Sequence, residues 1–273
     1  MIVYPNAKIN IGLNIVERRN DGYHNISTLF YPVKELKDIL EITIDDSLQE
    51  PLTFTQTGIQ LDCAPENNLC IKAYNLINSI QPLPSMRMHL HKLIPTGAGL
   101  GGGSADGAFA LKAINNLAGN LLDNKQLMNL ALELGSDCPF FILNTPCIGR
   151  GRGEILEPFE LSLNGYYILL INPGIHINTG KAYMQSTPKP WKTNLETLLK
   201  TDIANWPNNI KNDFEEAVFS QHTEIASIKK WMYEQGATYA AMSGSGSTVY
   251  GIFKTIPVID NRMSNYFSKI VLL

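Results

Sequence analysis

The chain has 273 residues, a formal net charge of −3 and 44% hydrophobic residues. At roughly 150 residues per domain this length allows about two domains, and the hydrophobic content supplies a core, which excludes a disordered chain. The slightly acidic balance argues against nucleic acid and a membrane surface as partners, because both need a clustered basic face. The sequence also lacks the long uncharged apolar stretch that a membrane span requires.

The N-terminal residues and the cysteines favour a cytoplasmic protein. The opening MIVYPNAKIN has neither the apolar core of a signal peptide nor an Arg- and Ser-rich transit pattern. Cys63, Cys70, Cys138 and Cys147 include no C-x-x-C pair, which disfavours a zinc or thioredoxin-type site. We therefore expect free thiols in a reducing compartment, and we assign no side chain to a metal ion.

In the first third of the chain, apolar periodicity predicts strands and one helix. Strands are predicted within residues 1–16, 27–33, 39–44 and 86–94, a turn at 20–22 and a helix at 69–80. The strand at 86–94 alternates strictly and is expected to be antiparallel. One of its faces should be solvated and carry Arg87, His89 and His91.

The rest of the chain mixes helices and strands. A helix is predicted after the glycine-rich segment at 97–104, and a second begins at a capping box of Asp123 and Gln126 and ends at Gly135. A strand at 166–171, a helix at 224–235 and a strand at 248–253 follow, with a domain boundary near the basic, glycine-rich residues 149–153. Without a regular β-α-β-α alternation, this order predicts an α+β protein with mixed or antiparallel sheets.

The glycine-rich segment carries the most functional information. It places five glycines within residues 97–103, directly before a predicted helix. Glycine is costly to order, so such a run suits a backbone that approaches a ligand closely or adopts positive φ. The first amides of a helix bind anions, so phosphate is the expected guest. The alternative is an ordinary flexible turn between a strand and a helix.

Two familiar nucleotide-binding patterns fit this segment poorly. Gly97-x-Gly99-x-x-Gly102 matches the dinucleotide fingerprint, but the preceding strand has a solvated face, unlike the buried parallel strand that the fingerprint requires. A Walker loop is excluded because no Gly-Lys-Ser/Thr ends the segment, so any lysine must come from elsewhere. Asp106, in the first turn of the predicted helix, would repel phosphate unless it points away or a divalent cation bridges the two.

Several other residues have ordinary structural interpretations when each stands alone. Lys8 suits a solvated edge strand, Asp137 suits a helix cap, and Tyr183 suits a core. The Tyr-His pair at 23–24 suits an exposed turn. The serine- and glycine-rich residues 243–247 could form a second loop that contacts an anion, or a simple hairpin turn.

Taken together, these residues resemble one family. Residues 95–104 resemble the phosphate-binding motif of the galactokinase, homoserine kinase, mevalonate kinase and phosphomevalonate kinase superfamily, and residues 243–247 resemble its C-terminal glycine-rich motif. More specifically, Ala7-Lys8-Ile9-Asn10 and Arg19-x-Asp21-Gly22-Tyr23-His24 resemble the 4-diphosphocytidyl-2-C-methyl-D-erythritol kinases. Residues 149–154, 173–183 and 212–215 extend the resemblance to about residue 253.

The resemblance implies an α+β fold of two domains. The first, residues 1–153, is an ATP-binding domain like ribosomal protein S5, and the second, residues 154–273, is ferredoxin-like. It implies that ATP, with Mg²⁺, phosphorylates the 2-hydroxyl of the methylerythritol part of the substrate, in the non-mevalonate route to isoprenoid precursors. The expected partners are these small molecules alone, and the expected state is a monomer or a weak homodimer.

The resemblance also implies roles for individual residues. Lys8 and Asp137 match the catalytic pair. The substrate-binding residues are matched by Asn10, Tyr23, His24, Thr179 and Tyr183, with the two tyrosines enclosing the cytosine and His24 reading its edge. The ATP phosphates are held by the segment Pro95, Thr96, Gly97, Ala98, Gly99, Leu100, Gly101, Gly102, Gly103, Ser104 and Ala105.

Three alternatives are less well supported. A homoserine or mevalonate kinase would share the glycine-rich loops but would not explain Asp21-Gly22-Tyr23-His24. An NAD-dependent oxidoreductase would depend on the poorly fitting fingerprint alone. A nucleotide-binding module without catalysis would not explain the joint presence of Lys8 and Asp137.

Overall fold

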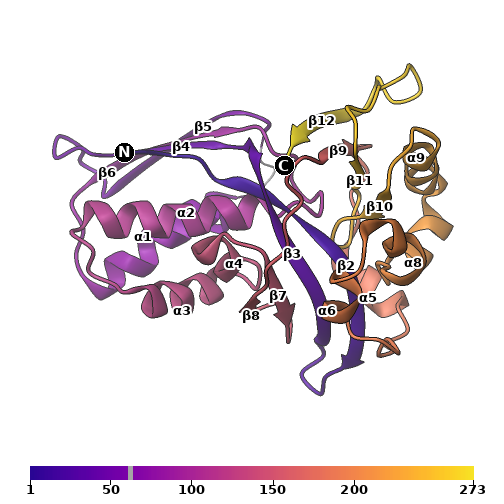
Figure 1. Ribbon diagram of the computed structural model, residues 1–273. Helices are drawn as coiled ribbons and strands as arrows, with labels where there is room; N and C mark the ends of the chain where they lie inside the picture. The colour runs from indigo at the N-terminus through magenta and orange to yellow at the C-terminus, as the bar shows by residue number, and fades with distance from the viewer. Residues whose placement is uncertain (61–63) are drawn as a thin grey trace. The chain divides into compact units, whose positions relative to one another are not determined.

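The computed structural model describes residues 1–60 and 64–273 and divides them into two compact units (Figure 1). The first unit contains Met1–Ala7, Lys34–Thr96 and Gly101–Thr145, and the second contains Lys8–Val33, Gly97–Leu100 and Pro146–Leu273. This division differs from a single boundary after residue 153, because the second unit includes an early segment of the chain. Cys63 lies outside the described residues, Cys70 and Cys138 are buried free thiols, and Cys147 is buried as well.

A mixed four-stranded sheet forms the first unit. Its order is β1-β4-β6-β5, with bounds Ile2–Val3, Ile39–Ile44, Met86–Lys92 and Leu52–Gly58. Strand β6 pairs antiparallel with β4, as predicted, but parallel with β5, which no periodicity predicted. The alternating residues Met86, Met88, Leu90 and Lys92 of β6 are buried. A lysine therefore continues the apolar face of this strand.

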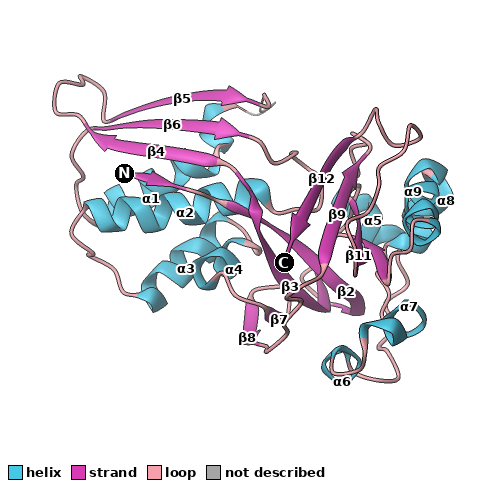
Figure 2. Cartoon of the chain, turned by 45° about the horizontal axis from the view of Figure 1, so that its top comes forward, coloured by secondary structure: helices cyan, strands magenta, loops and turns pink. Residues whose placement is uncertain are grey.

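Helices cover one face of this sheet (Figures 1 and 2). Their bounds are Leu69–Ile80 (α1), Gly102–Leu117 (α2), Asn124–Leu134 (α3) and Cys138–Leu143 (α4), with a 3₁₀ turn at Pro65–Asn67. The capping box of Asp123 and Gln126 is confirmed at the start of α3, and Gly135 ends that helix. Helices α1 and α2 pack closely at Gly107, where a Cβ would lie 2.8 Å from the Cβ of Leu69.

The early strands explain why the second unit includes an N-terminal segment. Strands β2 (Asn6–Arg18) and β3 (His24–Lys37) flank the predicted turn and join β7 (Cys147–Arg150) and β8 (Ile155–Pro158) in a sheet of order β2-β3-β7-β8. Thr28 pairs with Gly149, and Leu13 forms a parallel bridge with Asn212. The hairpin is thus hydrogen-bonded to residues from the C-terminal half of the chain.

The second unit also contains a ferredoxin-like antiparallel sheet. Its order is β10-β11-β9-β12, with bounds Tyr239–Met242, Val249–Phe253, Tyr167–Asn172 and Phe267–Leu272. This is the strand order of a β-α-β-β-α-β unit, although residues 254–266 between β11 and β12 are irregular. Strand β12 lies in the C-terminal tail, for which the sequence predicted no structure.

Helix α9 packs against strands β10 and β11 of this sheet. None of the described helices is long and apolar enough to cross a membrane. The core includes Ile228, Trp231 and Met232 from α9. The helix bounds are Thr179–Gln185 (α5), Leu195–Leu199 (α6), Trp206–Asn209 (α7), Glu215–Gln221 (α8) and Thr223–Glu234 (α9), with a 3₁₀ turn at Ile203–Asn205.

Candidate active site

The first half of the glycine-rich segment packs tightly against the serine-rich loop at 243–247. Gly97 and Gly99 have φ of +62° and +77°. A Cβ on Gly99 would lie only 2.0 Å from the carbonyl oxygen of Ser243. The Oγ of Ser243 donates to the carbonyl of Gly99 at 2.8 Å, and the amide of Thr248 donates to Ala98 at 3.1 Å. Close packing and positive φ therefore explain these glycines, and an ordinary flexible turn does not.

Lys8 and Asn10 adjoin the same segment in the second unit. The amide of Lys8 donates to the carbonyl of Leu100 at 2.9 Å, and the amide of Asn10 donates to the Oγ of Ser243 at 3.2 Å. The Lys8 side chain is 3% exposed, and its Nζ donates to the Oδ1 of Asn10 at 2.5 Å. Lys8 is therefore a buried lysine with a defined position, and the alternative of a solvated edge lysine is wrong.

The second half of the segment starts helix α2 in the first unit. Gly101 is the N-cap at φ +68°, and the helix that follows has 16 residues. Its first amides have no partners within the helix and form the anion-binding end that the sequence predicts. Gly103 is exposed at this end, and no atom lies within 4 Å of the position that a Cβ would take there.

Asp137 occupies the N-cap position of the short helix α4. Its side chain makes no capping hydrogen bond, and its backbone is helical, with φ −84° and ψ −16°. The interpretation of Asp137 as a simple helix cap is therefore wrong. Lys8 belongs to the second unit and Asp137 to the first, so each is described in its own surroundings. Their action as a pair stays a prediction.

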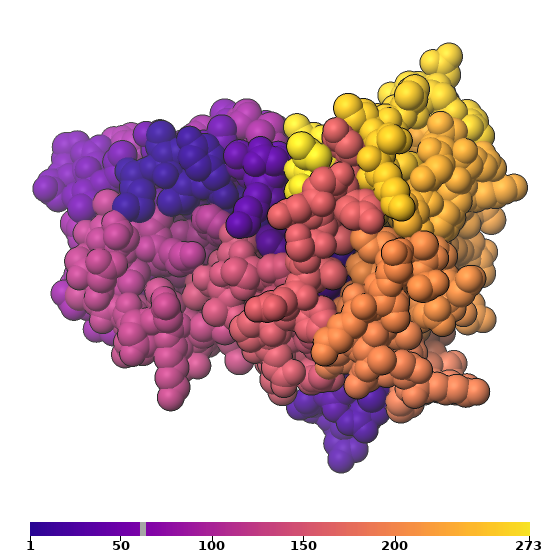
Figure 3. All heavy atoms as spheres, viewed as in Figure 1, coloured from indigo at the N-terminus to yellow at the C-terminus, as the bar shows by residue number. Residues whose placement is uncertain are grey.

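Three aromatic side chains of the second unit, Tyr23, His24 and Tyr183, form what we call the aromatic group. The rings of His24 and Tyr183 stack with centroids 4.8 Å apart and an interplanar angle of 13°. Burial, with a smaller effect from the charge of Arg18, lowers the pKa of His24 and favours the neutral ring. Tyr23 is 55% exposed at the β2–β3 turn, whose atoms project from the surface (Figure 3), and Arg152 lies 4.9 Å from its ring centroid.

Thr179 also meets the serine-rich loop. It is the first residue of α5, and its Oγ1 is hydrogen-bonded to the Oγ of Ser245 at 2.8 Å. A Cβ on Gly97 would lie 3.1 Å from the Nδ1 of His176, shortly before Thr179. The structure therefore brings the first half of the glycine-rich segment, the serine-rich loop and the residues before α5 together within one unit.

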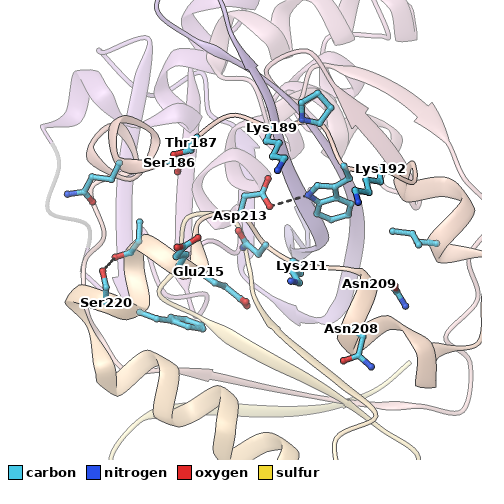
Figure 4. Close-up of a pocket in the computed structure, with 18 of the residues that line it drawn as sticks. Ser186, Thr187, Lys189, Lys192, Asn208, Asn209, Lys211, Asp213, Glu215 and Ser220 are labelled. Carbon is cyan, nitrogen blue, oxygen red and sulfur yellow. Dashed lines mark hydrogen bonds between the residues drawn. The ribbon is translucent and has the colours of Figure 1, made fainter.

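Asn212 is a supporting residue whose role the sequence did not reveal. Its Nδ2 donates to the carbonyls of Met242 and Gly244, each at 2.7 Å, and so it holds the serine-rich loop. Asp213 accepts a hydrogen bond from the indole of Trp191 at 3.2 Å (Figure 4) and another from Asn14 at 2.7 Å. These bonds indicate that residues 212–213, noted only as a motif match, have an architectural role.

The same two residues line a groove of about 1280 Å³ in the second unit (Figure 4). The labelled Lys189, Lys192 and Lys211 also lie along it, and all three are exposed. The groove is lined by none of the residues that the sequence predicts for catalysis, ATP or substrate. The predicted site therefore does not coincide with this groove.

The ion pair of Lys92 with Asp106 is the second feature that sequence reasoning missed. The expectation that Asp106 lies in the first turn is wrong, because α2 begins at Gly102 and Asp106 is its fifth residue. Its carboxyl group accepts from the buried Nζ of Lys92 at 2.7 Å, so it faces a cation in the interior of the unit. The sequence did contain a signal for the buried lysine. Side chains alternate between the two faces of a strand, and Lys92 falls on the same face as the buried Met88 and Leu90 of β6.

Comparisons with known proteins assign the family. Residues 68–145 match the family model described as GHMP kinases N terminal domain, and residues 194–262 match GHMP kinases C terminal. A curated relative from Parabacteroides distasonis, named 4-diphosphocytidyl-2-C-methyl-D-erythritol kinase, is 48% identical and covers 93% of this chain and 92% of its own. A relative of the same name from Bacteroides thetaiotaomicron is 45% identical, with coverage of 95% and 96%.

Solved structures agree with these relatives. A crystal structure of 4-(cytidine 5'-diphospho)-2C-methyl-D-erythritol kinase is similar with a TM-score of 0.79 and 32% identity, and the match covers 92% of this chain and 90% of that one. The mevalonate kinase of Methanococcus jannaschii has a TM-score of 0.71 at 11% identity, over 100% of this chain and 98% of its own, which shows a shared fold alone. The chain belongs to the 4-diphosphocytidyl-2-C-methyl-D-erythritol kinase family of the GHMP kinases.

Proposed function

We infer that the protein uses ATP to phosphorylate the 2-hydroxyl of 4-diphosphocytidyl-2-C-methyl-D-erythritol. The observation that carries this inference is the 48% identity to a kinase of that name along nearly the whole of both chains. Gly97 and Gly99, both at positive φ, leave this backbone without side chains where the ATP phosphates would approach, and this supports the proposal. ATP and the cytidine-linked alcohol are its small-molecule partners, and we place the reaction in the cytoplasm, where ATP is available.

We propose that residues 95–105 hold the ATP phosphates. The chain supplies backbone amides at the start of α2 and a backbone at 97–100 that is free of side-chain bulk at its glycines. Mg²⁺ would enter with ATP, since this ion keeps water and phosphate ligands and needs only one or two protein groups. The described residues contain no cluster of three or more His, Cys, Asp or Glu side chains that could hold a metal ion. Mg²⁺ supplies charge neutralisation of the phosphates when it is bound.

Lys8 and Asp137 are the catalytic residues in this proposal. The 2-hydroxyl oxygen bonds to the γ-phosphorus of ATP while the bond from that phosphorus to the β–γ bridging oxygen breaks, and ADP leaves. Asp137 orients the hydroxyl and accepts its proton late in the step. Lys8, a buried cation held by Asn10, stabilises negative charge on the transferred group. Positioning and charge stabilisation supply most of the catalysis in such transfers.

The aromatic group is proposed to bind the cytosine. Stacking on aromatic rings contributes about 1–3 kcal/mol per base in single-stranded nucleic-acid complexes. His24 lies against Tyr183, so the ring that would read the base edge is already next to a stacking surface. Asn10 and Thr179 would contact the remainder of the substrate, and both adjoin the serine-rich loop.

The test is release of ADP from Mg-ATP with purified protein and one acceptor at a time. We expect release with the cytidine-diphospho-methylerythritol, and only background release with mevalonate or homoserine. Release with mevalonate or homoserine instead would keep the kinase reaction and refute the proposed substrate. Folded protein that binds ATP but releases no ADP with any acceptor would refute the proposed reaction.

A further inference from the structure

Three charged side chains of the first unit meet in its interior. Lys92 at the end of β6 forms ion pairs with Asp38, which lies between β3 and β4, and with Asp106 of α2. All three side chains are at most 4% exposed. A fully buried lysine with two carboxylates is unusual, because each charge loses its hydration.

This charged cluster joins the two ends of the glycine-rich segment. The Oδ1 of Asp38 accepts hydrogen bonds from the amides of Leu93 at 2.6 Å and Ile94 at 2.9 Å, directly before the segment. Asp106 lies one turn into the helix that follows the segment. A Cβ on Gly102 would lie 2.9 Å from the Nζ of Lys92, so the helix start packs directly on the lysine.

The charges of the cluster balance only if it holds one extra proton. Two carboxylates and one ammonium leave a net charge of −1 in the interior, which is strongly unfavourable. The titratable groups that face Asp106 are Lys92 of β6, Asp38 and the thiol of Cys70 on α1, and burial raises the pKa of that thiol well above its usual range. None of these supplies a second cation.

The hydrogen bonds identify the carboxyl group that holds the proton. Asp38 accepts bonds at both oxygens, from two amides and from Lys92, as an ionised carboxylate does. The Oδ1 of Asp106 is buried and has no hydrogen-bond partner among the described residues. An unpaired oxygen is less costly on a neutral acid than on a carboxylate. Burial, with a further effect from the charge of Asp38, raises the pKa of Asp106 well above its usual range.

We propose that Asp38, Lys92 and Asp106 form a buried clamp that fixes the two ends of the glycine-rich segment for ATP binding, and that Asp106 enters it as the protonated acid. The acid proton lies toward Asp38, and Lys92 donates to both carboxyl groups. The cluster is then neutral, with one ammonium, one carboxylate and one carboxylic acid. The clamp residues are positioning residues, and their effect on ATP rests on the proposed function of residues 95–105.

The proton is tested by comparing the thermal stability of Asp106→Asn and Asp38→Asn between pH 5 and pH 9. Asparagine has the shape of the protonated acid and can donate to Asp38, so we expect Asp106→Asn to keep the wild-type Tm near pH 5. Asp38→Asn removes the only carboxylate of the neutral cluster, so its Tm should fall by more than about 5 °C, or the variant should fail to fold.

The proton on Asp106 also predicts how the stability of the wild type changes with pH. A folded state with a raised carboxyl pKa binds more protons than the unfolded state, so its stability declines as the pH rises above the ordinary value of 3.8. Asp106→Asn should lack this part of the decline. If Asp106→Asn loses as much stability as Asp38→Asn, or fails to fold, Asp106 is not protonated. An unchanged pH slope in Asp106→Asn would refute the proton as well.

The positioning role is tested by the Kd for ATP, measured by calorimetry without acceptor. We expect Asp106→Ala to weaken ATP binding by about tenfold and Asp106→Asn to restore it, while the KM for the cytidine-linked acceptor stays within about twofold of wild type. A lower Tm for Asp106→Ala with an unchanged Kd for ATP would show a merely structural cluster and refute the clamp. Failure of the wild type to bind ATP would refute the proposed function instead, and the proton would still be decided by the stability measurements.

Discussion

The glycine-rich segment and the aromatic group are built in opposite ways. Gly97–Leu100 is fixed by backbone hydrogen bonds and by close packing that leaves no room for a Cβ at Gly99. In the aromatic group, side chains provide the interacting surface, and Tyr23 is 55% exposed at a turn. The segment therefore tolerates almost no change in shape, whereas the aromatic group can vary at its exposed ring, Tyr23.

This difference matches the division of labour in the proposed reaction. Phosphate is common to every nucleotide-dependent kinase and can be bound by amides, which any sequence with enough glycine can present. A cytosine must be distinguished by rings and by contacts to its edge, which only particular side chains can make. We therefore expect substitutions in the segment to affect stability and ATP binding, and substitution of the exposed Tyr23 to affect the acceptor alone.

The largest expected effect is on the rate of the reaction that the glycine-rich segment and the aromatic group are proposed to serve. Asp137→Asn should lower kcat by about 10²- to 10⁴-fold, because the amide cannot accept the hydroxyl proton. The Kd for ATP and the KM for the acceptor should change little, since neither region is altered. Steady-state kinetics and ATP calorimetry measure both quantities. Unchanged turnover would remove Asp137 from the mechanism.

A smaller but still large effect is expected on the stability of the segment. Gly99→Ala should destabilise the protein by about 2–4 kcal/mol, since the new Cβ meets the carbonyl of Ser243 at 2.0 Å and φ is +77°. Chemical denaturation gives the free energy of unfolding.

Gly103→Ala is the matched control in the same segment. Gly103 lies in α2, and no atom lies within 4 Å of the place where the alanine methyl group would sit. Alanine there should stabilise the protein by about 0.5–1 kcal/mol, because it restricts the unfolded chain and favours the helix. Equal destabilisation by both substitutions would show that close packing is not what requires Gly99.

Removal of the exposed ring of Tyr23 should change only the kinetics with the acceptor. Tyr23→Ala should raise the KM for the cytidine-linked acceptor by about 5- to 150-fold, which corresponds to the loss of about 1–3 kcal/mol of stacking. The Tm and the KM for ATP should stay at wild-type values, because Tyr23 is half-exposed at a turn. A changed KM for ATP with an unchanged KM for the acceptor would show that Tyr23 serves ATP binding and would contradict its assignment to the acceptor.

Periodicity predicted the elements whose residues have one buried face. The helix at Leu69–Ile80 and the strand at Ile39–Ile44 have the predicted bounds, because each shows a clear apolar pattern. Strands β5 and β12 were missed, since neither contributes a strongly buried face, and β7, β8 and β10 were missed because four residues are too short to show a period. The parallel pairing of β5 with β6 depends on contacts between segments far apart in the sequence, which no local pattern encodes.

The candidate site also contains parts that could be predicted from the sequence and parts that could not. The glycine-rich segment was recognisable because positive φ and close packing restrict the residue type. The supporting residues were not, because Asn212 and Asp106 act through tertiary hydrogen bonds that resemble nothing in a linear sequence. Lys92 was predictable in principle, since a lysine in the buried register of a strand must find partners.

The most direct measurement compares the cytidine-linked acceptor with its uridine analogue, in the wild type and in His24→Ala. The His24 ring, which stacks on Tyr183 and whose pKa is lowered by burial, is the group proposed to read the base edge. We predict that the wild type favours the cytidine compound in kcat/KM, and that His24→Ala loses about 10- to 100-fold of this preference with the KM for ATP unchanged. A preference that survives in His24→Ala, or a wild type that uses both acceptors equally, would contradict the assignment of base recognition to the aromatic group.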